Sequence, residues 1–340
     1  MFAFYVVLPL LLAVLLYLLR KTAFANALLL LLTLALCLTA LEAYYRFFYC
    51  QSDGFGRLMK NFSDRYYRSD SYGLRASNLP LSRTKTNLVV VGDSHVFGAG
   101  LKRTADRFSE RLATHYPDLH VVNLGFPGWD SKTEVEQLRK YADPQAGVAV
   151  VILTYFFNDI EEDTTNADRG RINGPTQPAK PTVMDDALQW VSNYSRFVEM
   201  FYFRIGYPRL VRGRLGQIQM SYRDPAVRER HLATLEKLRE EVEQQYGAQL
   251  LIVTLPFLHS TPLLNETPFY QGFDASLNER GFRSIDMQPI FARYGIKKLQ
   301  VNRWDPHTNP RANRLVADAI IEYLDAHPDL LKRGQRRVVP

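Results

Sequence analysis

Cysteine is nearly absent from this chain, with only two among 340 residues. Cys37 lies inside an apolar run and Cys50 lies just beyond it, so the rest of the chain can form no internal disulfide. No cysteine–histidine group has metal-site spacing, and no glycine-rich loop has the spacing that binds phosphate or a dinucleotide. A disulfide scaffold is therefore excluded. We expect neither a metal nor an organic cofactor.

Charge is absent from residues 2–19, which are mostly Leu, Val and Phe and would span about 27 Å as a helix. Arg20 and Lys21 follow, and residues 23–41 form a second apolar run. A secretory signal peptide is the alternative, but the apolar length is too great and no basic residue precedes it. We predict a transmembrane hairpin of two spans over residues 1–45.

The orientation of this hairpin is predicted from its flanking charges. Arg20 and Lys21 favour the cytoplasmic side, which places the large C-terminal part across the membrane. Arg46, Arg57 and Lys60 lie on the other flank and oppose this assignment. We predict an integral protein of the inner cell membrane whose main domain faces the periplasm.

After a linker at residues 46–84, the pattern over residues 85–330 is typical of one α/β domain. Short apolar runs predict strands at 87–92, 119–124, 148–154, 248–254 and 284–288. Amphipathic stretches predict helices at 104–116, 131–142, 226–246 and 309–326. This alternation predicts a three-layer α/β/α sandwich with a parallel, flavodoxin-like sheet.

One serine lies where the first predicted strand stops. The apolar run ends at Gly92, and Asp93 and Ser94 follow it directly. Open α/β sheets hold their ligand sites at the carboxyl ends of their strands, so Ser94 would lie at such an edge. The alternative is that Ser94 caps a helix, a common role for serine.

Three later blocks place further functional groups at strand ends. Gly125 follows the second predicted strand, Asn158 follows the third, and Asp305 and His307 precede the last helix. Each has a structural alternative: a turn glycine, a capping asparagine, and a helix start with a surface histidine. Four unrelated structural roles that fall in this order at successive strand ends are less expected than a single functional site.

Serine, glycine, asparagine and then aspartate with histidine, in this order, resemble the SGNH (GDSL-type) hydrolases over about residues 85–327. The resemblance implies a serine esterase in which Ser94 is the nucleophile, His307 is the general base and Asp305 orients the imidazole. It also implies an oxyanion hole formed by the backbone N–H groups of Ser94 and Gly125 and by the side-chain amide of Asn158.

Two departures from the family pattern leave alternatives open. Asp305 precedes His307 by two residues where the family has three, so a backbone carbonyl could orient the ring and leave a Ser–His dyad. Phe156 stands where glycine is common, and it would either narrow the acyl pocket or fill core. These departures also motivate a different class of protein, a non-catalytic module that binds a glycan or a partner.

A long insert, about residues 161–225, separates the third and fourth predicted strands. Residues 161–182 are polar and rich in glycine and proline, which predicts an exposed loop. Aromatic residues are concentrated in 183–205, followed by Arg209, Arg212 and Arg214. This part is either a lid or membrane-facing flap, or a helix pair that packs on the domain.

The net charge of +7 and the basic tail at residues 331–340 favour acidic lipid or polysaccharide over nucleic acid. We therefore predict a membrane-tethered esterase that cleaves acyl esters, most simply O-acetyl groups, with an envelope glycan ahead of a lipid as the substrate. An O-acyltransferase that receives its acyl group from a partner would use the same site.

Overall fold

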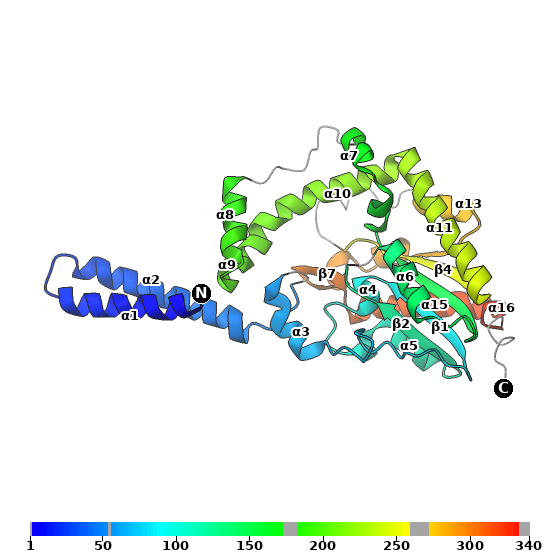
Figure 1. Cartoon of the computed structure of the whole chain (residues 1–340), viewed down its shortest axis with the longest axis horizontal. Coiled ribbons are helices and arrows are strands. Elements are labelled where there is room, and N and C mark those ends of the chain that lie inside the picture. Colours follow the sequence, from blue (N-terminus) through cyan, green and yellow to red (C-terminus); the bar gives the residue numbers. More distant parts are fainter. Residues whose placement is uncertain (1, 54–55, 129, 173–181, 259–271, 333–340) are drawn as a thin grey trace. The chain divides into compact units, whose positions relative to one another are not determined.

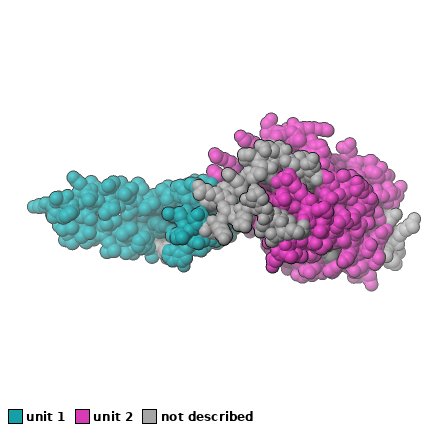
Figure 2. All heavy atoms as spheres, turned by 90° about the horizontal axis from the view of Figure 1, so that it is seen from above, with its two compact units in different colours: residues 1–65, 178–213 teal, residues 66–177, 214–340 magenta. Residues whose placement is uncertain are grey.

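The computed structural model describes the chain except for residues 1, 54–55, 129, 173–181, 259–271 and 333–340. Two compact units, coloured separately in Figure 2, comprise residues 1–65 with 178–213 and residues 66–177 with 214–340. Part of the predicted insert thus groups with the N-terminal residues. Nearly all of the predicted basic tail lies outside the described residues.

The elements of the smaller unit are mostly helical. They are α1 (Phe2–Leu19), α2 (Ala25–Ala43), η1 (Tyr44–Phe48), η2 (Arg57–Met59), α3 (Lys60–Tyr66, which ends one residue beyond the unit), α8 (Val183–Ser192), α9 (Arg196–Phe201) and η5 (Tyr202–Gly206). Helix α10 (Tyr207–Arg223) has residues in both units.

The larger unit alternates strands and helices (Figure 1). Its strands are β1 (Thr86–Gly92), β2 (Leu119–Gly125), β3 (Val148–Tyr155), β4 (Gln249–Thr254), β5 (Arg283–Asp286), β6 (Gln300–Asn302) and β7 (Asp305–Thr308). Its helices are α4 (Ser94–Phe97), η3 (Thr104–Asp106), α5 (Phe108–His115), α6 (Ser131–Tyr141), η4 (Asp159–Asp163), α7 (Asn166–Ile172), α11 (Pro225–Tyr246), α13 (Phe273–Glu279), α14 (Gln288–Ala292), η6 (Ile296–Lys298), α15 (Pro310–Ala326) and α16 (Asp329–Lys332).

The main sheet is parallel and has the order β2-β1-β3-β4-β5, which confirms the predicted flavodoxin-like arrangement. Every residue of β1 and β3 is buried, because helices cover both faces of a parallel sheet. The strand order reverses at β1, and Gly92 at its end pairs with Gly125 of β2 and Thr154 of β3. The carboxyl ends of these three strands therefore share one edge.

Helices cover both faces of the sheet. On one face α5 packs against α15, where the Phe108 N–H donates to the Asn313 side chain at 3.1 Å. On the other face α6 and α11 are joined by an ion pair between Arg139 and Glu241. This is the three-layer sandwich that the alternation of strands and helices predicts.

Two segments differ from the sequence-based prediction. Residues 305–308 form strand β7, paired antiparallel with β6, where we expected a loop before the last helix. The described part of residues 161–182 is not one exposed loop, because 166–172 form helix α7, and residues 173–181 lie outside the described residues. A reciprocal pair of hydrogen bonds between Thr165 and Asp168 starts α7, and such a capping pair begins a helix even in a polar sequence.

The N-terminal apolar runs are helical, as predicted. Helix α2 continues into η1, and Ala25–Phe48 is, within the described part of the chain, the one helix long and apolar enough to cross a membrane. The apolar stretch Ala3–Leu19 is shorter. The two-span membrane anchor therefore stays a prediction.

Candidate active site

Ser94 occupies the sharp turn that follows β1. Asp93 caps α4 by accepting a hydrogen bond from the His95 N–H at 2.8 Å. Asp93 thus has the capping role that was the alternative for Ser94, and Ser94 is the first residue of the helix. The turn needs Gly92, since a Cβ there would lie 2.3 Å from a methyl carbon of Val96. The Ser94 hydroxyl is consequently held at the edge of the sheet.

The structure brings together three of the predicted site residues. The Ser94 Oγ lies 2.9 Å from Nε2 of His307, and Nδ1 of His307 lies 2.5 Å from Oδ1 of Asp305. Asp305 is fully buried. A serine, an imidazole and a buried carboxylate in this order are the groups that nucleophilic catalysis by serine requires.

Strand β7 explains how an aspartate only two residues before the histidine can orient the imidazole ring. Alternate residues of a strand point to the same face, so the side chains of Asp305 and His307 lie beside each other. The His307 N–H also donates to Asp305 Oδ1, at 3.1 Å, which fixes the carboxylate from a second direction. A backbone carbonyl is therefore not needed to orient the ring.

The charges around His307 favour its protonated form. Burial alone would lower the pKa of His307, but the Asp305 carboxylate, and to a smaller extent Asp93, raise it above the usual value. Asp93 is itself buried, and this raises its pKa to about 6 even though the His95 N–H donates a hydrogen bond to it and the charge of His307 opposes the shift. The site is thus built to stabilise an imidazolium next to Ser94.

A second histidine and two phenylalanines line this edge. The ring of His95 lies 5.2 Å from that of His307 and 4.4 Å from that of Phe156, which in turn packs on Phe157. Burial and the neighbouring His307 charge keep the pKa of His95 well below its usual value. His95 is therefore neutral and forms part of an aromatic wall beside the base.

The amide of Asn158 is available at the end of β3. Asn158 occupies the N-cap position of η4, but its side chain makes no capping hydrogen bond. Among the described residues, neither this side chain nor the Ser94 N–H takes a hydrogen-bond partner. The capping role that was the alternative for Asn158 does not occur, and the oxyanion-hole role of both groups stays a prediction.

Gly125 differs from these two groups in the resting site, and its role as an oxyanion donor stays a prediction. Its N–H donates to the side chain of Asn123 at 3.0 Å and is thus already used. A Cβ at Gly125 would lie 2.3 Å from the backbone nitrogen of Phe97. Glycine is needed here because β2 passes close to α4, and the residue acts in packing.

Buried carboxyl groups surround this edge of the sheet. Burial and the neighbouring acids raise the pKa of Glu134 and of Asp159 well above the usual range. Both oxygens of the fully buried Glu134 carboxyl lack a hydrogen-bond partner among the described residues. These two groups are therefore protonated at a pH where exposed carboxyls are ionised.

Gly100 is a site residue that the sequence analysis missed. Its φ is +79°, and a Cβ would lie 2.8 Å from Oδ2 of Asp305 and 2.4 Å from a methyl carbon of Val301. Glycine thus lets the loop after α4 approach the buried carboxylate. Its place shortly after the serine motif was the only available signal.

No protein-family model and no curated protein sequence matches the chain. Its fold is similar to a G-D-S-L family lipolytic protein from Desulfitobacterium hafniense (11% identity, 70% of this chain and 99% of that chain, TM-score 0.42). It is also similar to a G-D-S-L family member from Veillonella parvula (14% identity, 71% of this chain and 98% of that chain, TM-score 0.40). A third similar structure is an acetyl xylan esterase from Geobacillus stearothermophilus (13% identity, 71% of this chain and 96% of that chain, TM-score 0.38).

Proposed function

We propose that this protein is a serine esterase that hydrolyses acyl esters through a covalent Ser94 acyl-enzyme. The observation that carries the proposal is the hydrogen-bonded chain from Ser94 through His307 to the buried Asp305 at the carboxyl edge of the sheet. The binding-module alternative was motivated by the short spacing of aspartate and histidine and by Phe156. Strand β7 accommodates that spacing, so we favour catalysis.

Ser94, His307 and Asp305 would carry out the reaction in two steps, and in each step His307 returns the proton that it takes. Nε2 of His307 takes the Ser94 proton as Oγ attacks the acyl carbon, and the resulting imidazolium is stabilised by Asp305. The same proton then passes to the leaving alkoxide, and the ester C–O bond breaks. Water attacks the acyl-enzyme by the same route and frees the acid and Ser94.

Covalent labelling tests this proposal directly. A fluorophosphonate probe is expected to label the full-length protein, and prior incubation with p-nitrophenyl acetate should slow the labelling. A glycan-binding module would stay unlabelled. If acetate moves to an added sugar hydroxyl faster than to water, the same site is working as an O-acyltransferase.

Replacing Asn158 with alanine is expected to lower kcat for p-nitrophenyl acetate by about 10²–10³-fold. The reason is that its amide N–H, which has no partner in the resting site, would meet the negative oxygen of the tetrahedral intermediate. KM should change little, because this bond strengthens only in the transition state. Asn193→Ala, far along the chain at the end of α8, is the matched control. Equal loss in both variants would contradict the role.

The aromatic wall favours a small acyl group. Phe156 is 9% exposed and stands between His95 and Phe157, so it limits the space beside His307. We expect acetate esters to react faster than butyrate esters. Phe156→Ala should reduce the ratio of kcat/KM for acetate esters to that for butyrate esters by about tenfold or more. The reason is that one or two extra methylenes change the rate by this much in an apolar pocket. An unchanged ratio of kcat/KM for the two esters would show that Phe156 only fills core.

We also propose that the smaller unit holds the enzyme at a membrane. At the end of α2 the fully buried Glu42 carboxylate accepts hydrogen bonds from the Ser195 hydroxyl at 2.8 Å and the Phe197 N–H at 3.1 Å. These bonds tie α9 to the apolar helix. Trp190 (60%) and Ile205 (59%) are exposed on the same unit, as suits a surface in contact with lipid.

This arrangement favours the membrane-facing flap among the interpretations of the insert. A periplasmic position and an O-acetylated envelope glycan as substrate remain parts of the proposal. They rest on the charges flanking the apolar runs and on the family resemblance.

A further inference from the structure

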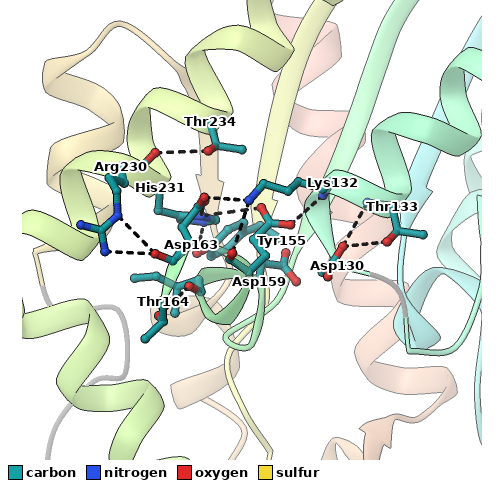
Figure 3. Close-up of polar contacts among 12 residues, drawn as sticks. Asp130, Lys132, Thr133, Tyr155, Asp159, Asp163, Thr164, Arg230, His231 and Thr234 are labelled. Carbon is teal, nitrogen blue, oxygen red and sulfur yellow. Dashed lines mark hydrogen bonds and ion pairs between the residues drawn. The ribbon is translucent and has the colours of Figure 1, made fainter. Parts of the chain in front are cut away.

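A second polar cluster, which the proposed reaction does not use, joins η4 to α11 and α6. Nδ1 of His231 lies 2.8 Å from Oδ2 of Asp163 and 3.8 Å from Oε1 of Glu162. The three ligand atoms lie within 4.8 Å of one another. Figure 3 shows His231 between Tyr155 and Asp163, with Lys132 reaching Asp163 from α6. No local sequence pattern indicates this cluster, because His231 is 68 residues away from Asp163.

Two buried tyrosines determine which nitrogen of His231 carries a proton. The Tyr222 hydroxyl donates to the carbonyl of Phe157 at 3.0 Å, and it lies 2.6 Å from the Tyr155 hydroxyl. The Tyr155 oxygen lies 2.8 Å from Nε2 of His231. These three contacts need three protons, and the two phenols supply two. Nε2–H supplies the third.

Nδ1 of His231 therefore presents a lone pair to Asp163. Asp163 is a carboxylate, because the Lys132 ammonium forms an ion pair with it at 2.8 Å. A lone pair and a carboxylate oxygen at 2.8 Å repel each other unless a positive centre lies between them. That centre is either a proton or a metal ion.

Glu162 favours the metal ion. Its side chain is only 3% exposed, and Oε1 has no hydrogen-bond partner among the described residues although it points toward Nδ1 of His231. Its other oxygen accepts the Lys132 N–H at 2.8 Å, which fixes the carboxylate. In a tetrahedral site with bonds near 2.0 Å, neighbouring ligand atoms are about 3.3 Å apart. The contacts of 2.8 and 3.8 Å lie on either side of that separation.

We propose that Glu162, Asp163 and His231 bind a divalent transition-metal ion such as Zn²⁺. One imidazole and two carboxylates suit this class of ion, and the Tyr155 hydroxyl orients the imidazole as an outer-shell partner. The ion fastens η4, which begins directly after Asn158, to α11. Its role is to hold the turn that carries the amide, and no step of ester cleavage passes through it.

The test measures bound metal in the full-length protein in detergent after chelator treatment and dialysis against Zn²⁺. We expect about one Zn²⁺ per chain by elemental analysis, and a rise in Tm when Zn²⁺ is added. Glu162→Gln and His231→Gln should lose both effects. Glu161→Gln should keep them, because the neighbouring Glu161 pairs with Arg214 instead. Tyr155→Phe should weaken Zn²⁺ binding by about 10–100-fold.

Circular dichroism of each variant shows whether the fold is retained, so these readouts do not depend on the esterase proposal. Zn²⁺ binding that is equal in the wild type, Glu162→Gln and His231→Gln would overturn the assignment. So would an ¹⁵N spectrum in which both His231 nitrogens carry protons and do not respond to Zn²⁺, because the positive centre would then be a proton.

Discussion

Replacing Ser94 with alanine is expected to lower kcat for p-nitrophenyl acetate by about 10⁶-fold, the largest effect of any change discussed for this protein. The Ser94 hydroxyl is the only group hydrogen-bonded to Nε2 of His307 among the described residues, so without it the base has no proton to take. The activity that remains should come from the oxyanion donors and from substrate binding alone. Stopped assays with purified protein measure this loss, and labelling by the fluorophosphonate probe should disappear with it.

The matched control is Ser276→Ala on α13, whose hydroxyl donates, among the described residues, only to the Gly272 carbonyl at 2.9 Å. It removes the same atom from a partly exposed position outside the site and should leave kcat unchanged. The proposal fails if Ser94→Ala keeps its rate or its label while folding normally. The nucleophile would then lie elsewhere, and the contact between Ser94 and His307 would be structural.

The sheet was predictable because its strands obey simple rules. Buried parallel strands are short, apolar and β-branched, and the predicted runs match β1, β2, β3 and β4 to within one residue at either end. The helices between them follow from the 3.6-residue period. The residues after each strand end could therefore be placed at one edge before any coordinates were known, which is why Ser94 and Asn158 were found.

What the sequence could not show depends on tertiary contacts. Strand β7 has only four residues, including Pro306, and exists because it pairs with β6. Gly125 is predicted as a backbone donor, but the close approach of Phe97 and the bond to the Asn123 side chain appear only in the structure. Gly100 faces a carboxylate more than two hundred residues away in sequence. No local pattern reports such neighbours.

The buried acids illustrate the same limit for electrostatics. Glu134 belongs to a polar, amphipathic stretch that predicted a helix correctly, but nothing there shows that its carboxyl is fully buried. Charged residues are rarely buried without a partner, so the expectation from sequence is an exposed side chain. Its raised pKa arises from burial and from acids on other segments, such as Asp159 and Asp93.

The second large effect is expected for Asp305→Asn, which should lower kcat by about 10⁴-fold. Asparagine is nearly the same size, so β7 should be retained. A neutral amide cannot stabilise the imidazolium, and it can hold His307 in the wrong tautomer. A Ser–His dyad, by contrast, would keep most of its rate. Asp325→Asn is the matched control, because Asp325 lies on the surface of α15 and accepts a hydrogen bond only from Tyr116 among the described residues.

The pH profile separates this electrostatic role from simple damage to the fold. The base works when neutral, so kcat/KM rises with pH as His307 loses its proton. Because Asp305 and Asp93 raise the pKa of His307, the midpoint of the wild-type rise should lie above about 6.5. In Asp305→Asn the burial of His307 still lowers its pKa, and the Asp305 charge that raised it is gone. The midpoint should therefore move to lower pH. A variant that loses activity at every pH with an unmoved midpoint would mean that Asp305 only supports β7.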